Sequence, residues 1–267
     1  MSKVSLNNNI IFSNINKGIL YNGDCLDILP QLKEDSVDLI VTSPPYNVKI
    51  DYNQYEDNLK YPKYLHFLNK VLWNCYRVLK LDGRICLNLP NVNINGRYFT
   101  VGDIHGIMKG LGFKYRNNIV WNKGNVSKRT AWGSWLSPSS PYLIEPYEFI
   151  LIYDKKLTKK RGCKTDLSKE EFIEWTNSLW NFKGETRKEI IKEHPAPFPE
   201  ELPYRLMKLY SYIDDLILDP FMGSGTTAVI AERLNRRWIG IELSKEYYEL
   251  SKKRILAVVE SRINESL

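Results

Sequence analysis

The chain alternates short apolar runs with longer segments in which apolar side chains recur at helical spacing. Residues 62–80 show the clearest helical period, with a proline near the start and Asp82-Gly83 as the stop. Shorter helices are predicted over residues 25–32, 100–113 and 204–211, after the loop within 222–234, and over 244–263. Strands are predicted over residues 18–24, 37–41, 83–90, 114–124, 147–155, 215–221 and 237–243. Strands that alternate with helices predict an α/β fold with a mainly parallel sheet covered on both faces.

Two of the predicted strands end in polar, proline-containing segments. The first is "VTSPPYNV" at residues 41–48, and the second is "LDPFMGSGTT" at residues 218–227. Proline donates no hydrogen bond to a sheet, so each strand must stop at that point. Because ligands of open α/β sheets bind outside the carboxyl ends of the strands, both segments are expected to face one crevice.

Length, charge and cysteine content narrow the class of protein. The 267 residues suffice for one large α/β domain or for one domain with an inserted lobe. The net charge of +7 favours a polyanionic partner, although a basic enzyme without one is the alternative. The four cysteines lack metal-site spacing and indicate reduced thiols, and no signal peptide or membrane segment is found, so a cytoplasmic protein without metal is expected.

The glycine-rich segment after residue 218 is typical of a ligand-binding turn. Gly223 and Gly225 allow the backbone to approach a ligand, and the helix that follows points its amide groups into the crevice. It lacks the lysine of a P-loop and the spacing of a dinucleotide fingerprint. Glu242 ends the next strand, where a carboxylate can accept hydrogen bonds from two ribose hydroxyls. The alternatives are a tight turn without ligand and a helix-capping glutamate.

These motifs carry a family resemblance. "DPFMGSGTT" with "GIEL", and "TSPPY" upstream, resemble the S-adenosylmethionine-dependent DNA amino-methyltransferases, and the order of the motifs resembles their circularly permuted β group. The resemblance covers nearly the whole chain. It implies a Rossmann-like methyltransferase fold: a circularly permuted, mainly parallel seven-stranded sheet with helices on both faces and a small target-recognition insertion.

The resemblance also implies roles for residues. S-adenosyl-L-methionine is the expected cofactor, with the glycine-rich turn around its methionine part, Glu242 on its ribose, and Asp24 and Cys25 near its adenine. Asp24 acting only as a helix cap is the alternative. The expected cofactor-binding residues are Asp24, Cys25, Pro197, Phe198, Asp219, Pro220, Phe221, Gly223, Ser224, Gly225, Thr226, Thr227, Glu242 and Leu243.

The first motif supplies the expected catalytic residues, Ser43, Pro44, Pro45 and Tyr46. An exocyclic amino group is a poor nucleophile, and acceptors at Ser43 Oγ and the Pro44 carbonyl can hold its hydrogens while it attacks. Tyr46 would stack on a base flipped out of the duplex. Trp121 is the aromatic expected on the opposite face of the base, with ordinary core packing as the alternative.

The resemblance favours the N4 amino group of cytosine as the target, because the "SPPY" form is most often associated with it. The N6 amino group of adenine is the close alternative. An RNA or protein amide methyltransferase and a non-catalytic nucleic-acid-binding relic are further alternatives, against which the basic insertion and the intact motifs argue.

The segment between the two halves departs from the α/β rhythm. Residues 1–123 and 194–267, with strand 146–154, are expected to form the catalytic and cofactor-binding domain, and residues 124–193 an approximate target-recognition region. Expected DNA contacts are Lys123, Lys128 and Arg129, with Lys159, Lys160, Arg161, Lys164 and Arg187 further along. A solvated charged insertion is the alternative. Double-stranded DNA, a second copy of the chain and a cognate restriction endonuclease are the expected partners.

Overall fold

The computed structural model describes residues 11–47, 51–52, 55–56, 58–91, 98–124, 133–141, 143, 145–162, 164–194 and 197–266. Its strands are β1 (Ile11–Ile15), β2 (Gly18–Asn22), β3 (Val37–Thr42), β4 (Asp51–Tyr52), β5 (Tyr55–Glu56), β6 (Leu79–Leu89), β7 (Lys114–Asn122), β8 (Tyr147–Asp154), β9 (Leu179–Asn181), β10 (Leu216–Asp219) and β11 (Arg237–Glu242). Its helices are α1 (Cys25–Ile28), the 3-10 turn η1 (Leu29–Gln31), α2 (Tyr61–Val78), α3 (Thr100–Gly110), α4 (Lys169–Trp175), α5 (Lys188–Glu193), α6 (Glu201–Tyr210), α7 (Thr226–Arg233) and α8 (Lys245–Ser266).

One large sheet organises the molecule. Within the described ranges it has nine strands in the order β1-β2-β11-β10-β3-β6-β8-β7-β9, and β4 pairs separately with β5. Strands β2, β11, β10, β3 and β6 are parallel neighbours, and β8 runs antiparallel between β6 and β7. The mainly parallel sheet is confirmed. The count of seven was too low, because β1 and β9 extend the two edges.

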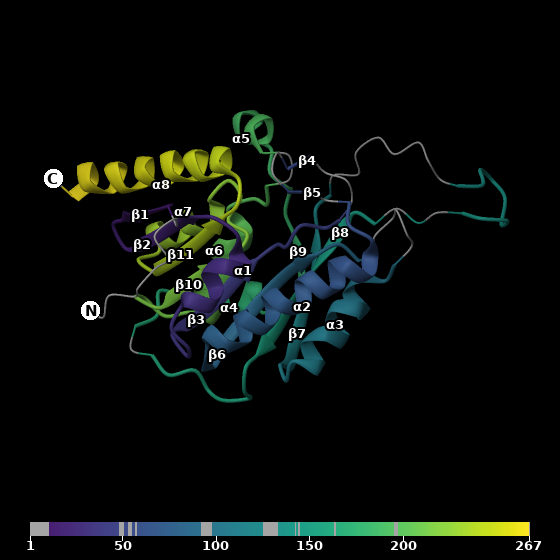
Figure 1. Cartoon of the computed structure of the whole chain (residues 1–267), viewed down its shortest axis with the longest axis horizontal. Helices are drawn as coiled ribbons and strands as arrows, with labels where there is room; N and C mark the ends of the chain where they lie inside the picture. Colours follow the sequence, from purple (N-terminus) through teal and green to yellow (C-terminus); the bar gives the residue numbers. More distant parts are fainter. Residues whose placement is uncertain are drawn as a thin grey trace.

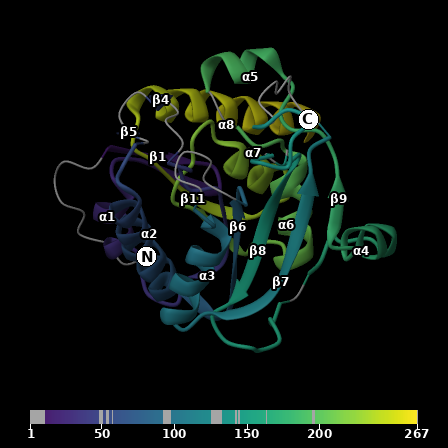
Figure 2. The same ribbon diagram turned by 90° about the vertical axis from the view of Figure 1, so that its right-hand side faces the viewer.

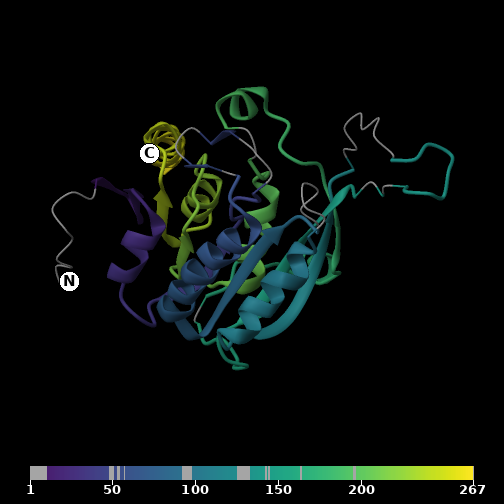
Figure 3. The same cartoon turned by 45° about the vertical axis from the view of Figure 1, so that its right-hand side comes forward.

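Helices cover both faces of the sheet, as the alternating pattern predicts. Figures 1 and 3 show α2 and α3 on one side and α7 and α8 on the other. Each face has its own apolar core, and successive residues of β3 serve both: Ile40 packs with α2, whereas Leu39 and Val41 pack with α6 and α7. All six residues of β3 are buried, which explains why four of them are apolar in a strand with both faces covered.

One predicted boundary was wrong, and one strand was not predicted. Helix α2 ends at Val78 and not at the Asp82-Gly83 pair, because β6 begins at Leu79 and includes that pair. Residues 155–193, where no sheet pattern is visible, contain β9, which pairs in parallel with β7. Figure 2 shows this edge of the sheet, with α4 beside β9. Three residues are too few for periodicity to reveal a strand.

Candidate active site

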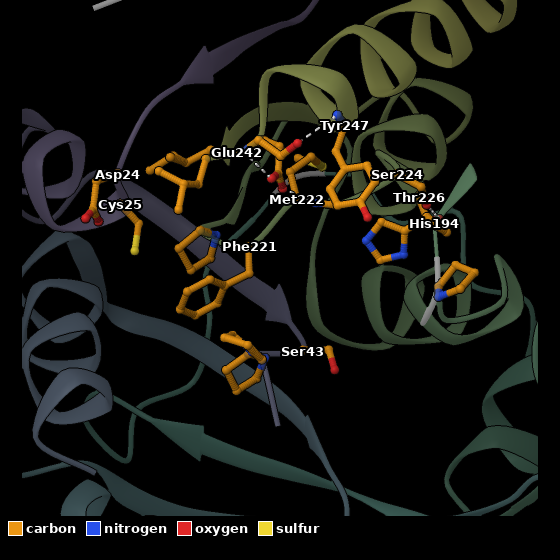
Figure 4. Close-up of a pocket in the computed structure, with 18 of the residues that line it drawn as sticks. Asp24, Cys25, Ser43, His194, Phe221, Met222, Ser224, Thr226, Glu242 and Tyr247 are labelled. Atoms are coloured by element: carbon orange, nitrogen blue, oxygen red, sulfur yellow. Dashed lines mark hydrogen bonds between the residues drawn. The ribbon is translucent and has the colours of Figure 1, made fainter. Parts of the chain in front are cut away.

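A cavity of about 290 Å³ lies at the carboxyl ends of the parallel strands. It is bordered by the segments that follow β2, β3, β10 and β11 and by the segment that leads into α6. Figure 4 shows Asp24 and Cys25 at one end, Ser224, Thr226 and His194 at the other, with Phe221 between them and Ser43 facing this row. The two proline-containing strand ends therefore open into the same cavity, as the strand pattern predicts.

The glycine-rich turn forms one wall of the cavity. Gly223 and Gly225 have φ angles of +53° and +83°, which L side chains rarely adopt. A Cβ atom added to Gly223 would stand 2.8 Å from Nε2 of His194. Gly225 is the N-terminal cap of α7, so the first amides of this helix, at Thr226 and beyond, begin at the cavity wall.

Asp219 holds the turn from beneath and does not line the cavity. Its Oδ1 accepts hydrogen bonds from Thr42 Oγ1 (2.7 Å) and Phe221 N (3.0 Å), and its Oδ2 accepts one from Thr227 Oγ1 (2.7 Å). Burial raises the pKa of this carboxyl to about 6, against these three hydrogen bonds. The carboxylate thus ties β3 to the turn. Asp219, Thr227 and Gly225 lie behind the lining of the cavity, and a direct contact of these residues with the cofactor stays a prediction.

Glu242 lines the cavity directly beside the turn. Its Oε2 accepts a hydrogen bond from Gly223 N (2.7 Å), and its Oε1 accepts one from Ser244 N (2.8 Å). Burial raises the pKa of Glu242 to about 7, and the nearby Asp219 contributes in the same direction. Leu243 also lines the cavity. A buried carboxylate of this kind gains from any further donor that a ligand brings.

At the other end of the cavity, Asp24 has two roles. Its Oδ1 accepts a hydrogen bond from Leu26 N (2.8 Å), so it caps α1 as the alternative interpretation holds. The residue also lines the cavity, as does Cys25, where burial raises the pKa of the thiol. The described cysteines Cys25, Cys75 and Cys86 are free and buried, whereas Cys163 lies outside the described residues.

The remaining cofactor prediction agrees with the cavity wall. Pro197, Phe198, Pro220, Phe221, Ser224 and Thr226 all line it. The sequence did not single out several further lining residues, namely Gly23, Leu26, Phe67, His194, Met222, Ile241, Ser244 and Tyr247. Among these, His194 packs against Tyr247, with 4.6 Å between the ring centroids. Burial, followed by the charge of Arg254, lowers the pKa of His194 to about 4. The histidine is therefore neutral at physiological pH.

The segment Ser43–Tyr46 forms the wall opposite the glycine-rich turn. Tyr64 donates a hydrogen bond to the Pro45 carbonyl (2.9 Å), which fixes the segment on α2. Ser43 Oγ lies 2.8 Å from the Tyr46 hydroxyl. Sequence reasoning missed the polar side chains behind them, Asn88 at the end of β6 and Glu148 at the start of β8. A lone polar residue in an apolar strand was the available signal.

The predicted DNA contacts divide into three groups. Trp121 is only 2% exposed, stacks on Phe182 and donates to its carbonyl, so the core-packing alternative describes it and the predicted stacking on a base is not supported. Lys123 Nζ pairs with Glu148 Oε1 at 2.5 Å beside the Ser43 wall. Lys128 and Arg129 lie outside the described residues.

The downstream cations do not face the cavity. Lys160 is buried and pairs with Asp38 (2.8 Å) and Asp215 (3.2 Å), which stand at the amino ends of β3 and β10. Lys164 lies in the same place, since its carbonyl accepts from Ile213 N. The run that holds Lys159, Lys160, Arg161 and Lys164 therefore lies at the end of the sheet opposite the cavity. Arg187 pairs with Glu185 and Glu200.

The cavity fits the cofactor that the resemblance implies, S-adenosyl-L-methionine. It joins a buried carboxylate at Glu242 to a backbone cradle at Gly223 that a Cβ would fill, and it continues along the apolar side chain of Phe221. A sugar hydroxyl can donate to the first, and a zwitterionic amino-acid end can meet the amides at the start of α7. Within the described ranges, no group of three His, Cys, Asp or Glu residues could hold a metal ion, and no helix combines the length and hydropathy that a membrane span requires.

Comparisons with known proteins agree with this site. A family model for DNA methylases, covering N6 and N4 methyltransferases, matches residues 37–253. The chain is 48% identical over 186 residues to the type II methyltransferase M.MjaVI of Methanocaldococcus jannaschii, covering 69% of this chain and 95% of that protein. It is 31% identical to the type II methyltransferase M2.DpnII of Streptococcus pneumoniae, covering 92% of each.

Solved structures show the same likeness. TTHA0409 of Thermus thermophilus, described as a DNA modification methylase and complexed with S-adenosyl-L-methionine, matches with a TM-score of 0.72 at 30% identity, covering 90% of this chain and 95% of that one. The cytosine-N4-specific PvuII DNA methyltransferase shares the fold, with a TM-score of 0.72 at 23% identity over 92% of each chain. The chain therefore belongs to the N6/N4 family of DNA methylases, amino-methyltransferases whose methyl donor is S-adenosyl-L-methionine.

Proposed function

We propose that this protein methylates the N4 amino group of cytosine at a specific site in duplex DNA, after flipping the base into the cavity, as the modification enzyme of a type II restriction–modification system. One observation carries the proposal: Ser43–Tyr46 and the glycine-rich turn line the same cavity. Thr42, directly before Ser43, is hydrogen-bonded to Asp219 at the foot of that turn. Relatives named as type II methyltransferases support the biological setting.

The chain's own residues suit amino-group chemistry. When bound, S-adenosyl-L-methionine supplies a methyl group on a positively charged sulfur, and its transfer leaves the acceptor nitrogen with one proton too many. Ser43 Oγ and the Pro44 carbonyl accept the amino hydrogens and so favour a nitrogen lone pair that points at the methyl group. The bond from Tyr64 to the Pro45 carbonyl keeps the segment in place before the base arrives. Tyr46 lines the same wall and offers a ring for the base.

The choice between the two bases rests on Ser43. A serine is a weaker proton acceptor than the aspartate found in the "DPPY" form, and the resemblance associates it with cytosine. Adenine N6 is the alternative, because the family includes both activities. Trp121, which was expected on the opposite face of the base, is buried in the core. Tyr46 is the aromatic side chain of the Ser43–Tyr46 segment, and it borders the cavity.

The placement of the basic residues narrows the proposed recognition region to the segment between β7 and β8. Residues 133–141 of this segment project away from the sheet in Figures 1 and 3 and are mostly exposed, including Trp135 at 66%. The segment leaves the carboxyl end of β7, which is the edge of the sheet that carries the cavity. We propose that this arm contacts the duplex beside the flipped base. A pair of chains and a cognate endonuclease remain expectations of the resemblance.

The test is direct. The purified protein is incubated with tritiated S-adenosyl-L-methionine and unmethylated plasmid DNA, RNA or a protein extract, and the labelled DNA is hydrolysed and separated by chromatography. Label in N4-methylcytosine supports the proposal. Label in N6-methyladenine would show that the target base is adenine and not cytosine. Label only in RNA or protein, or cofactor binding without label, would refute DNA methylation by this chain.

A further inference from the structure

A network of hydrogen-bonded polar side chains connects the Ser43 hydroxyl to the carboxylate of Glu148, which lies outside the cavity. Ser43 Oγ lies 2.8 Å from the Tyr46 hydroxyl, which donates to Glu148 Oε2 at 3.2 Å. The amide nitrogen of Asn88 donates to both the Tyr46 hydroxyl (2.9 Å) and Glu148 Oε2 (2.7 Å). The other carboxylate oxygen of Glu148 pairs with Lys123 Nζ at 2.5 Å. Four separate segments of the chain supply these residues.

The Glu148 carboxylate determines which group donates and which accepts in each hydrogen bond of this network. A carboxylate paired with a lysine has no hydrogen to give, so the hydrogens of Tyr46 and Asn88 must point toward Glu148. The Tyr46 oxygen is then left to accept the hydrogen of Ser43. A second acceptor for that hydrogen, the backbone carbonyl of Asn88, is more distant at 3.3 Å. Asn88 Nδ2 approaches Ser43 Oγ only to 3.5 Å, so with its hydrogen directed away Ser43 Oγ keeps a lone pair for whatever occupies the cavity.

The orientation of Asn88 is consistent with this direction. Its side chain is 2% exposed, and among the described residues no donor reaches Oδ1. Turning the amide over would bring Oδ1 within 2.7 Å of the Glu148 carboxylate and replace an attraction with a repulsion. The arrangement thus satisfies the carboxylate and the tyrosine and leaves the amide oxygen of Asn88 without a partner.

Resting on the proposed function, we propose that Glu148 is a positioning residue that fixes the Ser43 hydroxyl as a proton acceptor and receives the proton released on methylation. As the N–C bond forms from the amino lone pair, the C–S bond breaks and its electron pair stays on sulfur. The positive charge passes to the nitrogen, which gives one proton to Ser43 Oγ. Ser43 passes its own proton to Tyr46, and Tyr46 passes its own to Glu148, so one proton moves in total. Lys123 then has a neutral partner.

The experiment measures single-turnover methylation of unmethylated plasmid DNA with enzyme in excess. Glu148→Gln, which keeps the size and removes the charge, should slow the rate about 100-fold, as expected when an acid–base group is lost. The dissociation constants for S-adenosyl-L-methionine and for DNA, measured by calorimetry and by filter binding, should stay within about twofold, because Glu148 does not line the cavity. Glu34→Gln, the same change on a carboxylate that pairs with Arg77 at the amino end of β3, away from the cavity, is the matched control and should keep the wild-type rate.

A double variant separates positioning from a general structural role. If Glu148 acts through Ser43, Glu148→Gln should slow a Ser43→Ala protein by less than about twofold, because the effects of residues that act as a unit do not add. If the negative charge is what matters, Glu148→Asp should methylate about tenfold faster than Glu148→Gln. The Asp variant also tests the inference if the Gln variant fails to fold. An unchanged rate in Glu148→Gln, or full additivity with Ser43→Ala, overturns the inference while DNA methylation stands. Absence of labelled DNA with the wild type refutes the proposed function as well.

Discussion

Replacing Asp219 with asparagine should make the protein more stable than the wild type at alkaline pH. Asp219 is fully buried, and burial raises its pKa to about 6 from an ordinary value of 3.8, although three donors bond to it. The folded protein therefore binds this proton more tightly than the unfolded chain does. The contribution of the group to stability is complete below pH 3.8 and is lost as the pH rises through 6.

The size of the effect follows from the two pKa values. Compared with a group that stays neutral, the raised pKa of Asp219 lowers the stability of the folded protein by about 2 kcal/mol at pH 5 and by about 3 kcal/mol at pH 8. An asparagine does not ionise. Its Oδ1 can keep the bonds from Thr42 and Phe221, and its Nδ2 can donate to a Thr227 hydroxyl that has turned round. Between pH 5 and pH 8 the variant should therefore gain about 1 kcal/mol on the wild type.

Urea denaturation of both proteins, followed by circular dichroism at pH 5, 6, 7 and 8, measures this difference. The charge of Asp219 also contributes to the raised pKa of Glu242, so its removal should lower the cost of ionising Glu242 and add to the gain. A stability difference that does not change with pH, or one that moves against the variant as the pH rises, would refute the reasoning. It would show that the three hydrogen bonds balance or outweigh the effect of burial on the pKa of Asp219 in the folded state.

Three further predictions concern the cavity. Ser43→Ala should keep the wild-type affinity for S-adenosyl-L-methionine in calorimetry but lose about 100-fold in methylation rate, and an unchanged rate would remove its acceptor role. Because Glu242 has a pKa raised to about 7 and ribose hydroxyls favour its ionised form, cofactor affinity should rise about tenfold from pH 6 to pH 8, and Glu242→Gln should abolish this dependence. Gly223→Ala, with φ of +53° and a Cβ 2.8 Å from His194, should cost about 1–2 kcal/mol of stability by urea denaturation and weaken cofactor binding. The control Gly110→Ala, where an added Cβ meets nothing within 4 Å, should do neither.

The site was predictable where its residues follow buried strands. The largely apolar sequence of β3 predicts the strand, and the proline pair after it predicts where the strand ends. The same pattern recurs at β10. Because these strands pair in parallel, their carboxyl ends meet at one edge, so local pattern alone brings Ser43 near Gly223. The backbone needs of the turn are equally local, since only glycine adopts its left-handed positions without strain.

Burial of Trp121 was not predictable, because it depends on a strand that the sequence conceals. The residue faces the same side of β7 as Ile119, which would be an exposed edge if the sheet ended at β7. Strand β9 covers that edge: Trp180 is the register partner of Trp121, and Phe182 stacks on the Trp121 indole. A tryptophan at an apparent edge resembles a ligand-stacking residue until the covering strand is known.

The basic run was misinterpreted for a related reason. Lys160 sits among charged neighbours and resembles a solvated cation, yet its partner Asp38 is 122 residues away in the chain. A buried lysine needs such a partner, and Asp38 accepts from Lys80 as well. Local charge counts cannot reveal ion pairs between distant segments. The same limit hid Glu148 in β8, which contacts Asn88 in β6 and Lys123 directly after β7.

At Asp219, the stability of the fold and the geometry of the site make opposite demands on the side chain. Only a carboxylate accepts from Thr42, Thr227 and Phe221 at once, and this common direction fixes both the residue before Ser43 and the start of α7. An asparagine can keep all three contacts only if the Thr227 hydroxyl reverses, and it removes the negative charge that lies beneath the start of α7 at the cavity wall. Asp219→Asn should therefore bind S-adenosyl-L-methionine more weakly and transfer methyl groups more slowly while being the more stable protein at pH 8, as expected when a buried charge is kept for function. A variant that gained stability and kept both wild-type constants would show that the carboxylate serves neither the turn nor the catalytic segment.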